Sequence, residues 1–246
     1  MMKSPAPANP ELPRQEGKAA QVQAMFSGIA RRYDLLNTVL SLGLDKGWRR
    51  DAVRAAFAGG AGRVLDVATG TADLALALKK YKPSAEVIGV DFVEAMLEIG
   101  RRKARERGVE VRLEQGDGLA LPYPDASFDA LTVAYGLRNF ADVDRGLQEF
   151  YRVLRPGGRV VVLEFPPPPE GPFGKLFRFY FLQVLPRIGG LVSGRGGAYR
   201  YLPESVLAFP APPELAAKMA HAGFESVSFK LQTLGVSALH TGSKPV

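Results

Sequence analysis

Three acidic residues each follow a short apolar stretch, and together they suit a cationic ligand. Asp66 and Asp91 stand at the ends of two such stretches, and Asp117 follows a third within a Gly-Asp-Gly turn. The small residues around Gly70 let a ligand approach the backbone closely. Asp91 lies 21 residues beyond Gly70, where an acid accepts hydrogen bonds from ribose hydroxyls in nucleotide-binding sheets. The spacing therefore indicates a nucleoside-containing ligand.

The same loop argues against a phosphate-bearing nucleotide. A dinucleotide site favours G-x-G-x-x-G and a helix N-terminus that is free to hold pyrophosphate. Only Gly70 of the expected glycines is present, and Asp66 and Asp73 would repel phosphate. S-adenosylmethionine carries a sulfonium, an ammonium and a ribose diol, which suit several carboxylates better. The alternative is that Asp66 and Asp73 only cap the following helix.

A parallel sheet would bring these residues together. Alternating strands and helices predict right-handed crossovers and an α/β fold. Ligands of such sheets bind beyond the carboxyl ends of the strands, where the strand order reverses. The expected strands are 63–67, 86–90, 109–114, 128–134, 159–164, 225–231 and 235–241, and the expected helices are 72–80, 93–107, 142–154 and 214–222.

The segments outside this alternation are expected to flank the sheet within one domain, 19–246. Residues 1–18 are rich in proline and are expected to be disordered. Residues 19–58 are expected to form N-terminal helices, because apolar residues recur there every three or four positions. Residues 166–210 open with four prolines and continue with an apolar, aromatic stretch. We interpret them as a helical insertion on the substrate side of the sheet.

Composition limits the chemistry further. The chain has 246 residues, of which 46% are apolar and 23% are charged, and these values exclude wholesale disorder. It has no cysteine and two histidines, so thiolate chemistry is excluded and no metal site is expected. The net charge of +7 suits an anionic partner without selecting one. No signal peptide and no uninterrupted apolar span is seen, and a cytoplasmic location is expected.

Six longer segments resemble one family. They are MFSGIARRYDLLNTVLSLGLDKGWRR (25–50), VLDVATGTADLA (64–75), YGLRNFADVD (135–144), YRVLRPGGRVVVLEFPPP (151–168), YRYLPESVLAFP (199–210) and ALHTGSK (238–244). In this order they resemble the demethylmenaquinone/ubiquinone-biosynthesis C-methyltransferases, within the class I S-adenosylmethionine-dependent methyltransferases. The resemblance implies a seven-stranded, mostly parallel, Rossmann-like sheet with helices on both faces. It also implies methyl transfer onto a ring carbon of a prenylated quinol in menaquinone biosynthesis, with S-adenosylhomocysteine as product.

The resemblance also assigns cofactor residues by position. It places Thr71, Asp91, Asp117 and Gly118 at the cofactor, beside Asp66 and Gly70 of the small-residue loop. Two positions depart from the family pattern: Ala134 replaces a serine, and Ala72 replaces the second glycine of the loop. A lost hydroxyl contact is worth only about 0.5–1.5 kcal/mol, so the interpretation is unchanged.

Methylation of a ring carbon requires a ring hydroxyl that has lost its proton, or donors that stabilise the oxyanion. A phenolic pKa of about 10 leaves little phenolate at neutral pH. Arg138 and Asn139 follow the carboxyl end of the fourth strand, and Arg138 is expected to stabilise the oxyanion or orient water. The alternative for Arg138 is a surface ion pair with Asp142 or Asp144. His240 is the alternative base, although a structural histidine is the commoner outcome on an apolar strand.

Substrate and partner contacts are expected near the insertion. Tyr135, Tyr199 and Tyr201 are candidate substrate-binding residues, with packing as the alternative. An apolar stripe within 173–191, with cations nearby, predicts reversible membrane contact, and core packing is its alternative. A homodimer is left open. Nucleic acid is not expected, because no basic groove carries interleaved aromatics.

Other functions also stay open. The ring could be a benzoquinol of ubiquinone biosynthesis, or the substrate another small molecule or lipid. A non-enzymatic alternative is a lipid-binding protein that keeps the methyltransferase fold, since fold does not fix function. The acids Asp91 and Asp117 argue against such an inactive site.

Overall fold

The computed structural model describes residues 43–179 and 197–246, together with residues 17, 20, 22–28, 30, 41 and 183. Apart from Gly17, the segment 1–18 that is expected to be disordered lies outside the described residues. Much of the expected apolar stripe within 173–191 also lies outside them.

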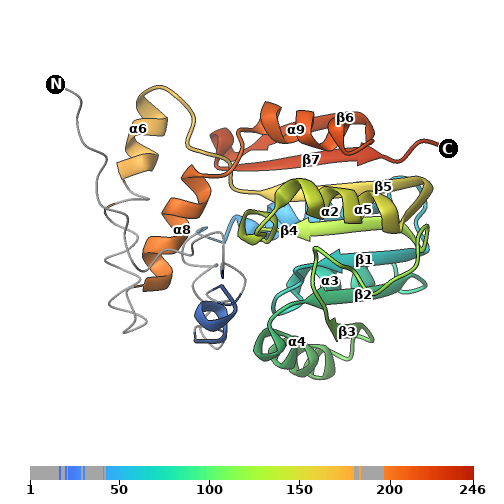
Figure 1. Ribbon diagram of the computed structural model, residues 1–246. Helices are drawn as coiled ribbons and strands as arrows, with labels where there is room; N and C mark the ends of the chain where they lie inside the picture. The colour runs from blue at the N-terminus through green and yellow to red at the C-terminus, as the bar shows by residue number, and fades with distance from the viewer. Residues whose placement is uncertain are drawn as a thin grey trace.

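Seven strands form one sheet in the order β3-β2-β1-β4-β5-β7-β6 (Figure 1). They are β1 (Arg63–Val67), β2 (Glu86–Asp91), β3 (Arg112–Gln115), β4 (Phe128–Ala134), β5 (Leu154–Glu164), β6 (Glu225–Gln232) and β7 (Ser237–Ser243). Neighbouring strands are parallel, except that β7 runs antiparallel to both β5 and β6. The expected seven-stranded, mostly parallel sheet is confirmed.

Helices cover both faces of this sheet. They are α2 (Asp45–Phe57), α3 (Asp73–Tyr81), α4 (Glu94–Arg107), α5 (Val143–Val153) and α9 (Pro212–His221). The chain also forms α6 (Pro172–Phe179), α8 (Gly197–Leu207) and the short 3-10 turns η1 (Leu137–Asn139) and η3 (Thr233–Gly235). Successive strand residues point to opposite faces. Val64 and Val161 belong to the core under α2 and α3. Leu65 and Val160 belong to the core under α5 and α9. Burial on both faces explains why the central strands are continuously apolar.

Strand β5 begins earlier than the sequence predicts. The run Pro156-Gly157-Gly158 indicates a break between helix and strand, yet β5 already starts at Leu154. The pairing with β4 shifts register between Phe128 and Ala130, so the Pro-Gly-Gly run forms a bulge rather than a connection. Gly157 has a φ of +73°, in the left-handed region that glycine adopts without strain.

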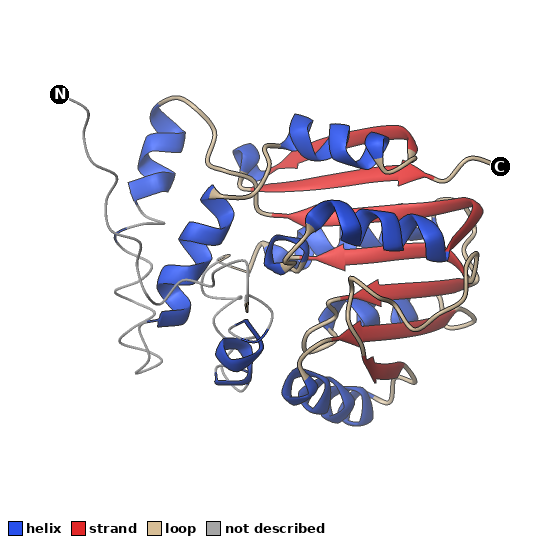
Figure 2. Cartoon of the chain, viewed as in Figure 1, coloured by secondary structure: helices blue, strands red, loops and turns tan. Residues whose placement is uncertain are grey.

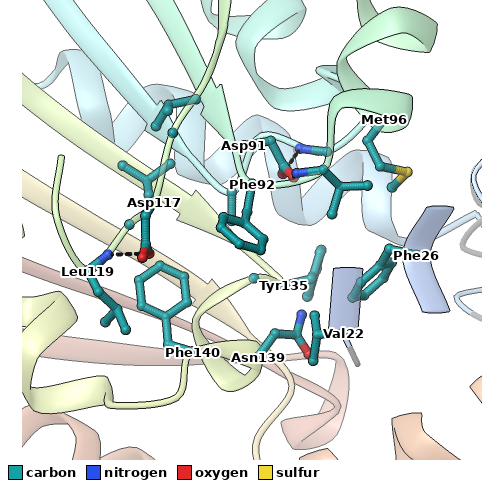
Figure 3. A pocket seen from close by; sticks show the side chains of 18 of the residues that line it. Val22, Phe26, Asp91, Phe92, Met96, Asp117, Leu119, Tyr135, Asn139 and Phe140 are labelled. Carbon is teal, nitrogen blue, oxygen red and sulfur yellow. Dashed lines mark hydrogen bonds between the residues drawn. The ribbon is translucent and has the colours of Figure 1, made fainter. Parts of the chain in front are cut away.

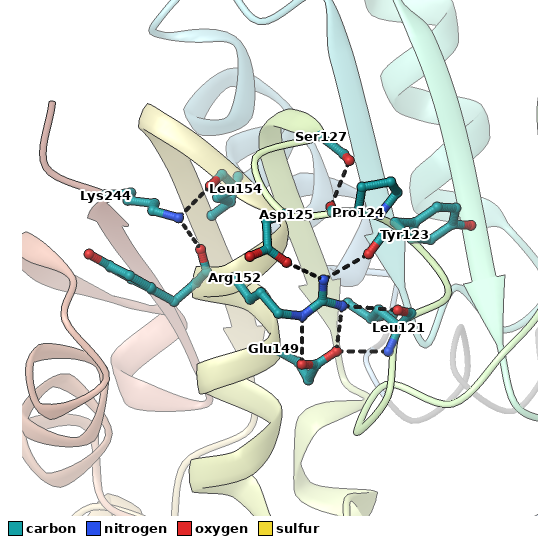
Figure 4. A network of polar contacts seen from close by, with 10 residues as sticks. Leu121, Tyr123, Pro124, Asp125, Ser127, Glu149, Arg152, Leu154 and Lys244 are labelled. Atoms are coloured by element: carbon teal, nitrogen blue, oxygen red, sulfur yellow. Dashed lines mark hydrogen bonds and ion pairs between the residues drawn. The ribbon is translucent and has the colours of Figure 1, made fainter.

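One arginine fastens the loop between β3 and β4 to helix α5 (Figure 4). Arg152 donates to the carbonyl oxygens of Leu121 at 3.0 Å and Tyr123 at 2.8 Å. It also pairs with Glu149 and Asp125, each at 2.8 Å. This network fixes the loop that continues from the Gly-Asp-Gly turn, and so helps to hold that turn in place.

Helices α6 and α8 lie beyond the carboxyl ends of the parallel strands (Figure 2). Both fall within residues 166–210, the expected helical insertion, and α8 contacts the turn η1. The division of the chain into one domain with this insertion stays a prediction. Among the described helices, none has both the length and the apolar character needed to cross a bilayer.

Candidate active site

A pocket opens at the carboxyl ends of β1 to β4. The strand order reverses here, because β2 and β3 follow on one side of β1 and β4 lies on its other side. Its volume is about 850 Å³, including the open space at its mouth. A helical segment at residues 22–28 contributes Phe26 to its wall, and Phe92 and Phe140 face it from the body of the protein (Figure 3). Asp91 and Asp117 reach this largely apolar pocket from adjacent strand ends, as the sequence predicts.

Asp91 ties the small-residue loop to the start of α4. One carboxylate oxygen accepts the Gly70 N–H at 2.7 Å, and the other accepts the Val93 N–H at 2.8 Å. Burial raises the pKa of Asp91, and these backbone hydrogen bonds oppose the rise. An ionised carboxylate has about four acceptor positions, so Asp91 keeps capacity for a ligand hydroxyl while it holds the loop.

Asp117 and Gly118 shape the opposite side of the pocket. The Asp117 carboxylate accepts the Leu119 N–H at 2.9 Å and closes the turn. A Cβ atom at Gly118 would lie 2.3 Å from Cζ of Phe140. Glycine is therefore required there for Phe140 to form the pocket wall.

Asp66 and Thr71 belong to a smaller polar cavity of about 360 Å³ beside Gly70. Asp66 accepts hydrogen bonds from the hydroxyls of Thr69 and Thr132, both at 2.6 Å, and burial raises its pKa to about 6. Thr71 accepts from Nζ of Lys103 at 2.9 Å. Asp66 and Thr71 therefore lie next to the larger pocket, on the far side of the loop from Asp91.

The residue that replaces the loop's second glycine keeps the glycine-like backbone. Ala72 has a φ of +65° and stands directly before α3. A left-handed conformation costs roughly 1–2 kcal/mol for a residue other than glycine. The alternative interpretation, in which Asp73 caps α3, is wrong: the start of α3 has no side-chain cap. The Asp73 carboxylate instead pairs with Lys103 at 2.9 Å.

The polar and aromatic groups that line the larger pocket fit S-adenosylmethionine. No lysine or arginine is among the described residues that line it, so a phosphate group would meet no counter-charge there. Carboxylates at adjacent strand ends suit nucleoside hydroxyl and amine groups, and the aromatic wall suits a flat ring. In the part of the chain that the structure describes, no group of His, Asp and Glu side chains is arranged to hold a metal ion.

Arg138 is packed against a buried carboxylate that sequence reasoning missed. Its Nη1 lies 2.7 Å from Oε1 of Glu164 and also donates to the Tyr135 carbonyl oxygen. Glu164, the last residue of β5, is 1% exposed. Burial raises the pKa of Glu164, and the guanidinium opposes that rise. The sequence did carry a signal for Glu164: it is an acid at the end of an apolar strand, the same feature that singled out Asp66.

These contacts correct the expected surface ion pair of Arg138 and place its guanidinium away from the pocket lining. The guanidinium is buried, and it is not among the described groups that line the pocket. The surface ion pair is not formed either: Asp142 caps α5, and Asp144 pairs with Lys218 at 2.8 Å. A catalytic role for Arg138 stays a prediction.

Asn139 does line the pocket, and Tyr201 of α8 fixes its amide. The Tyr201 hydroxyl donates to Oδ1 of Asn139 at 3.0 Å, which leaves the amide NH2 as the end that can donate toward the pocket (Figure 3). The sequence placed these two residues at the site in different roles, and the structure joins them. Tyr199 lies on the same helix, but its side chain is outside the described part of the chain.

Tyr135 forms the boundary between the two cavities. Its ring stacks on Phe165 with centroids 4.4 Å apart, and its backbone has a φ of +58°. Burial raises the pKa of Tyr135, so its hydroxyl stays protonated at neutral pH. The predicted substrate contact of Tyr135 stays a prediction.

His240 is not among the described residues that line the pocket. It is 1% exposed on β7, and Nε2 lies 3.0 Å from the Pro212 carbonyl oxygen. Burial lowers the pKa of His240 and keeps the ring neutral. Its ring packs on Phe229, with centroids 5.4 Å apart. The structural alternative that the sequence left open describes this histidine better than the catalytic one.

Solved structures share this arrangement of strands and helices. The [4+2]-cyclase SpnF matches with a TM-score of 0.69 at 20% identity, over 93% of this chain and 96% of its own. A Thermotoga maritima protein described as an S-adenosylmethionine-dependent methyltransferase matches with a TM-score of 0.62 at 22% identity, over 90% of this chain and 99% of its own. These likenesses concern the fold alone. The fold is that of the class I S-adenosylmethionine-dependent methyltransferases.

The chain belongs to the ubiE/COQ5 methyltransferase family, whose sequence model matches residues 14–244. A demethylmenaquinone methyltransferase of Thermus thermophilus is 62% identical over 90% of this chain and 100% of its own length. A demethylmenaquinone methyltransferase of Deinococcus radiodurans is 56% identical over 96% of this chain and 97% of its own length. A ubiquinone/menaquinone biosynthesis C-methyltransferase of Geobacter sulfurreducens is 47% identical over 92% of this chain and 90% of its own length. The family resemblance carried by the sequence motifs is confirmed.

Proposed function

We propose that this protein methylates a ring carbon of demethylmenaquinol, a prenylated quinol, and releases S-adenosylhomocysteine. The observation that carries the proposal is the pocket at the strand ends, where the described lining residues combine Asp91 and Asp117 with an apolar wall and include no lysine or arginine. The names of the Thermus and Deinococcus relatives support the choice of substrate.

The side chains divide the work as follows. Asp91 and Asp117 accept hydrogen bonds from the cofactor, which supplies an activated methyl group when bound. The Asn139 amide donates to the quinol oxygen and so favours loss of its proton. When bound there, S-adenosylmethionine would supply the methyl group to the ring carbon. Water would accept the hydroxyl proton and then the ring proton that the methyl group replaces, and would return one proton to the quinol oxygen. Arg138 acts as a positioning residue, because its pairing with Glu164 anchors the turn that carries Asn139.

Alignment supplies much of the acceleration. Holding the methyl group in line with the ring carbon can contribute on the order of 7–11 kcal/mol. Phe26 and Phe140 close the pocket from opposite elements, and we propose that they exclude water around the aligned groups.

A labelled-methyl assay tests the proposal. The purified protein is incubated with methyl-labelled S-adenosylmethionine and either short-chain demethylmenaquinol or the corresponding polyprenyl benzoquinol. We expect label in menaquinol. Label in the benzoquinol alone would shift the function to ubiquinone biosynthesis, which the name of the Geobacter relative also mentions. No transfer to either ring would leave the non-enzymatic or other-substrate alternatives.

We further propose that the protein works at the cytoplasmic face of a membrane, where a prenylated quinol resides. Helix α6 carries Phe179, which is 59% exposed, beside the basic Arg178. A basic amphipathic helix of this kind can lie in the membrane interface. Sedimentation with liposomes should show binding that Phe179→Glu weakens, and equal binding of both proteins would remove α6 from the contact. Sedimentation velocity tests the homodimer.

A further inference from the structure

A second concave surface lies outside the pocket, between α2, α3 and α4. We call it the basic groove; its volume is about 1270 Å³, including open solvent. Its charged lining consists of Lys46, Arg49, Arg50, Lys80, Lys103 and Arg107, with the two acids Asp45 and Asp73. The groove therefore has an excess of four positive charges.

The floor of the groove is held by ion pairs. Arg49 pairs with Asp45, and both side chains are at most 14% exposed. Lys103 contacts Asp73 at 2.9 Å. The two acids are thus engaged with cations of the groove, since Asp73 also lies 3.8 Å from Arg107. The remaining positive excess belongs to the rim.

The rim cations come from more than one helix. Lys46 and Arg50 lie on α2 and Lys80 lies on α3, and all three are exposed. None of their three side chains makes an ion pair or hydrogen bond with any residue that the structure describes. A solvated face of one helix would not bring cations from two helices to one concavity. Bringing like charges together costs free energy that a bound anion offsets.

We propose that the basic groove binds an oxyanion of the phosphate class. A multiply charged anion matches the excess of positive charge, and its several oxygens accept from guanidinium and ammonium donors at once. Two sources share this chemistry: a free diphosphate and the headgroup of an acidic phospholipid. A single-stranded nucleic acid fits less well, because Tyr81 is the one aromatic side chain among the described residues that line the groove, and a stacking platform needs several.

The groove is independent of the proposed methyl transfer but is adjacent to the cofactor loop. Arg49 and Asp73 line both the groove and the small cavity beside Gly70. Anion binding can therefore be measured without quinol, and its failure would leave the methyltransferase proposal untouched.

The test is calorimetric titration of the whole protein with sodium pyrophosphate at physiological ionic strength. A parallel arm uses phosphatidylcholine vesicles with and without phosphatidylglycerol. The variant is Arg50→Glu/Lys80→Glu. Its matched control is Arg102→Glu/Arg105→Glu, which makes the same charge change at exposed positions of α4 outside the groove. Circular dichroism and thermal melting verify that both variants fold.

We expect pyrophosphate to bind the parent protein, at least about tenfold weaker binding in the groove variant, and a change below about twofold in the control. The same pattern with phosphatidylglycerol vesicles alone would support the site and identify the lipid as its source. Absence of binding in both arms, or equal weakening in both variants, would overturn the proposal. Tighter binding of a single-stranded RNA oligomer than of pyrophosphate would overturn it as well.

Discussion

A single carboxylate can fix a loop and bind a ligand at the same time, and Asp91 is placed to do both. Its two oxygens already accept the backbone N–H groups of Gly70 and Val93. An ionised carboxylate has about four acceptor positions, and Asp91 is also a lining residue of the pocket. Removal of this side chain should therefore affect the ligand and the loop together.

We predict that Asp91→Ala weakens S-adenosylmethionine binding by roughly 10- to 150-fold, since a charge-assisted hydrogen bond is worth roughly 1.5–3 kcal/mol. Isothermal titration calorimetry measures the effect. Asp125→Ala is the control, because Asp125 is an exposed acid whose partner is Arg152. An affinity equal to that of the parent protein would remove Asp91 from the cofactor contacts.

The buried pair of Arg138 and Glu164 makes a prediction about stability. Arg138→Met should lower the free energy of unfolding by about 3–5 kcal/mol, because it leaves the Glu164 carboxylate buried without its cation. Arg138→Met/Glu164→Leu should recover most of that loss. Urea unfolding of the three proteins measures both effects. If the double variant is no more stable than the single one, the cost does not come from the unpaired charge.

At the scale of single residues, the sequence predicts the acids at the strand ends that line the pocket. It misses the buried ion pair of Arg138 and Glu164. Asp91 and Asp117 could be placed because residue type and position after a strand both limit what they contact, and Gly118 because the family resemblance assigns it. The partner of Arg138 could not be placed from local spacing, which favours Asp142 four positions away. Glu164 lies 26 residues away, and only the parallel pairing of β4 with β5 brings it to Arg138.

The contact between α8 and η1 gives a prediction at the scale of elements. Tyr201→Phe removes the hydroxyl that holds the Asn139 amide, so we expect kcat to fall by roughly 2- to 13-fold, the equivalent of about 0.5–1.5 kcal/mol. Cofactor affinity should stay unchanged. Tyr123→Phe is the matched control, because it loses one hydrogen bond, to Glu114, outside the pocket. Equal turnover in both variants would mean that Tyr201 only packs.

Strands with two buried faces are the elements that the sequence predicts best. The bounds 63–67 and 128–134 agree with β1 and β4 because apolar runs ended by loops mark them on both sides. β3 starts three residues later than expected, since the Val109 N–H bonds back to the carbonyl oxygen of Ala104 and completes the end of α4. Proline and glycine mark the bulge in β5, but they do not distinguish a bulge from a break.

For the whole molecule, the buried Asp66 couples stability to pH. Burial raises its pKa from 3.8 to about 6, so the folded protein binds a proton that the unfolded chain releases between these values. The resulting stabilisation is fully present below about pH 4 and is lost as the pH rises through about 6, with a size of about 3 kcal/mol. Asp66→Asn should remove this part of the pH dependence, because an amide does not titrate in this range. The fold should be kept, because the amide can still bond to both threonine hydroxyls.

Urea unfolding of the parent and the Asp66→Asn protein, without cofactor, at several values between pH 4 and pH 7 checks the prediction. The lowered pKa of His240 has the opposite sign, since its protonation favours unfolding as the pH falls below about 6.5. That contribution is the same in both proteins and cancels in their difference. A difference that stays constant over this range would contradict the assignment to Asp66.

The placement of β7 between β5 and β6 also bears on how the chain is made. The ribosome releases β1 to β5 first, and these strands can already pair with one another. β6 emerges next but has no neighbour in the sheet until β7 follows it, because each of its pairings is with β7. The last two strands must therefore join as a hairpin. Until then β5 presents an open edge, the kind of surface that invites pairing with other chains. A nascent chain that stalls before Ser237 is expected to need a chaperone at that edge.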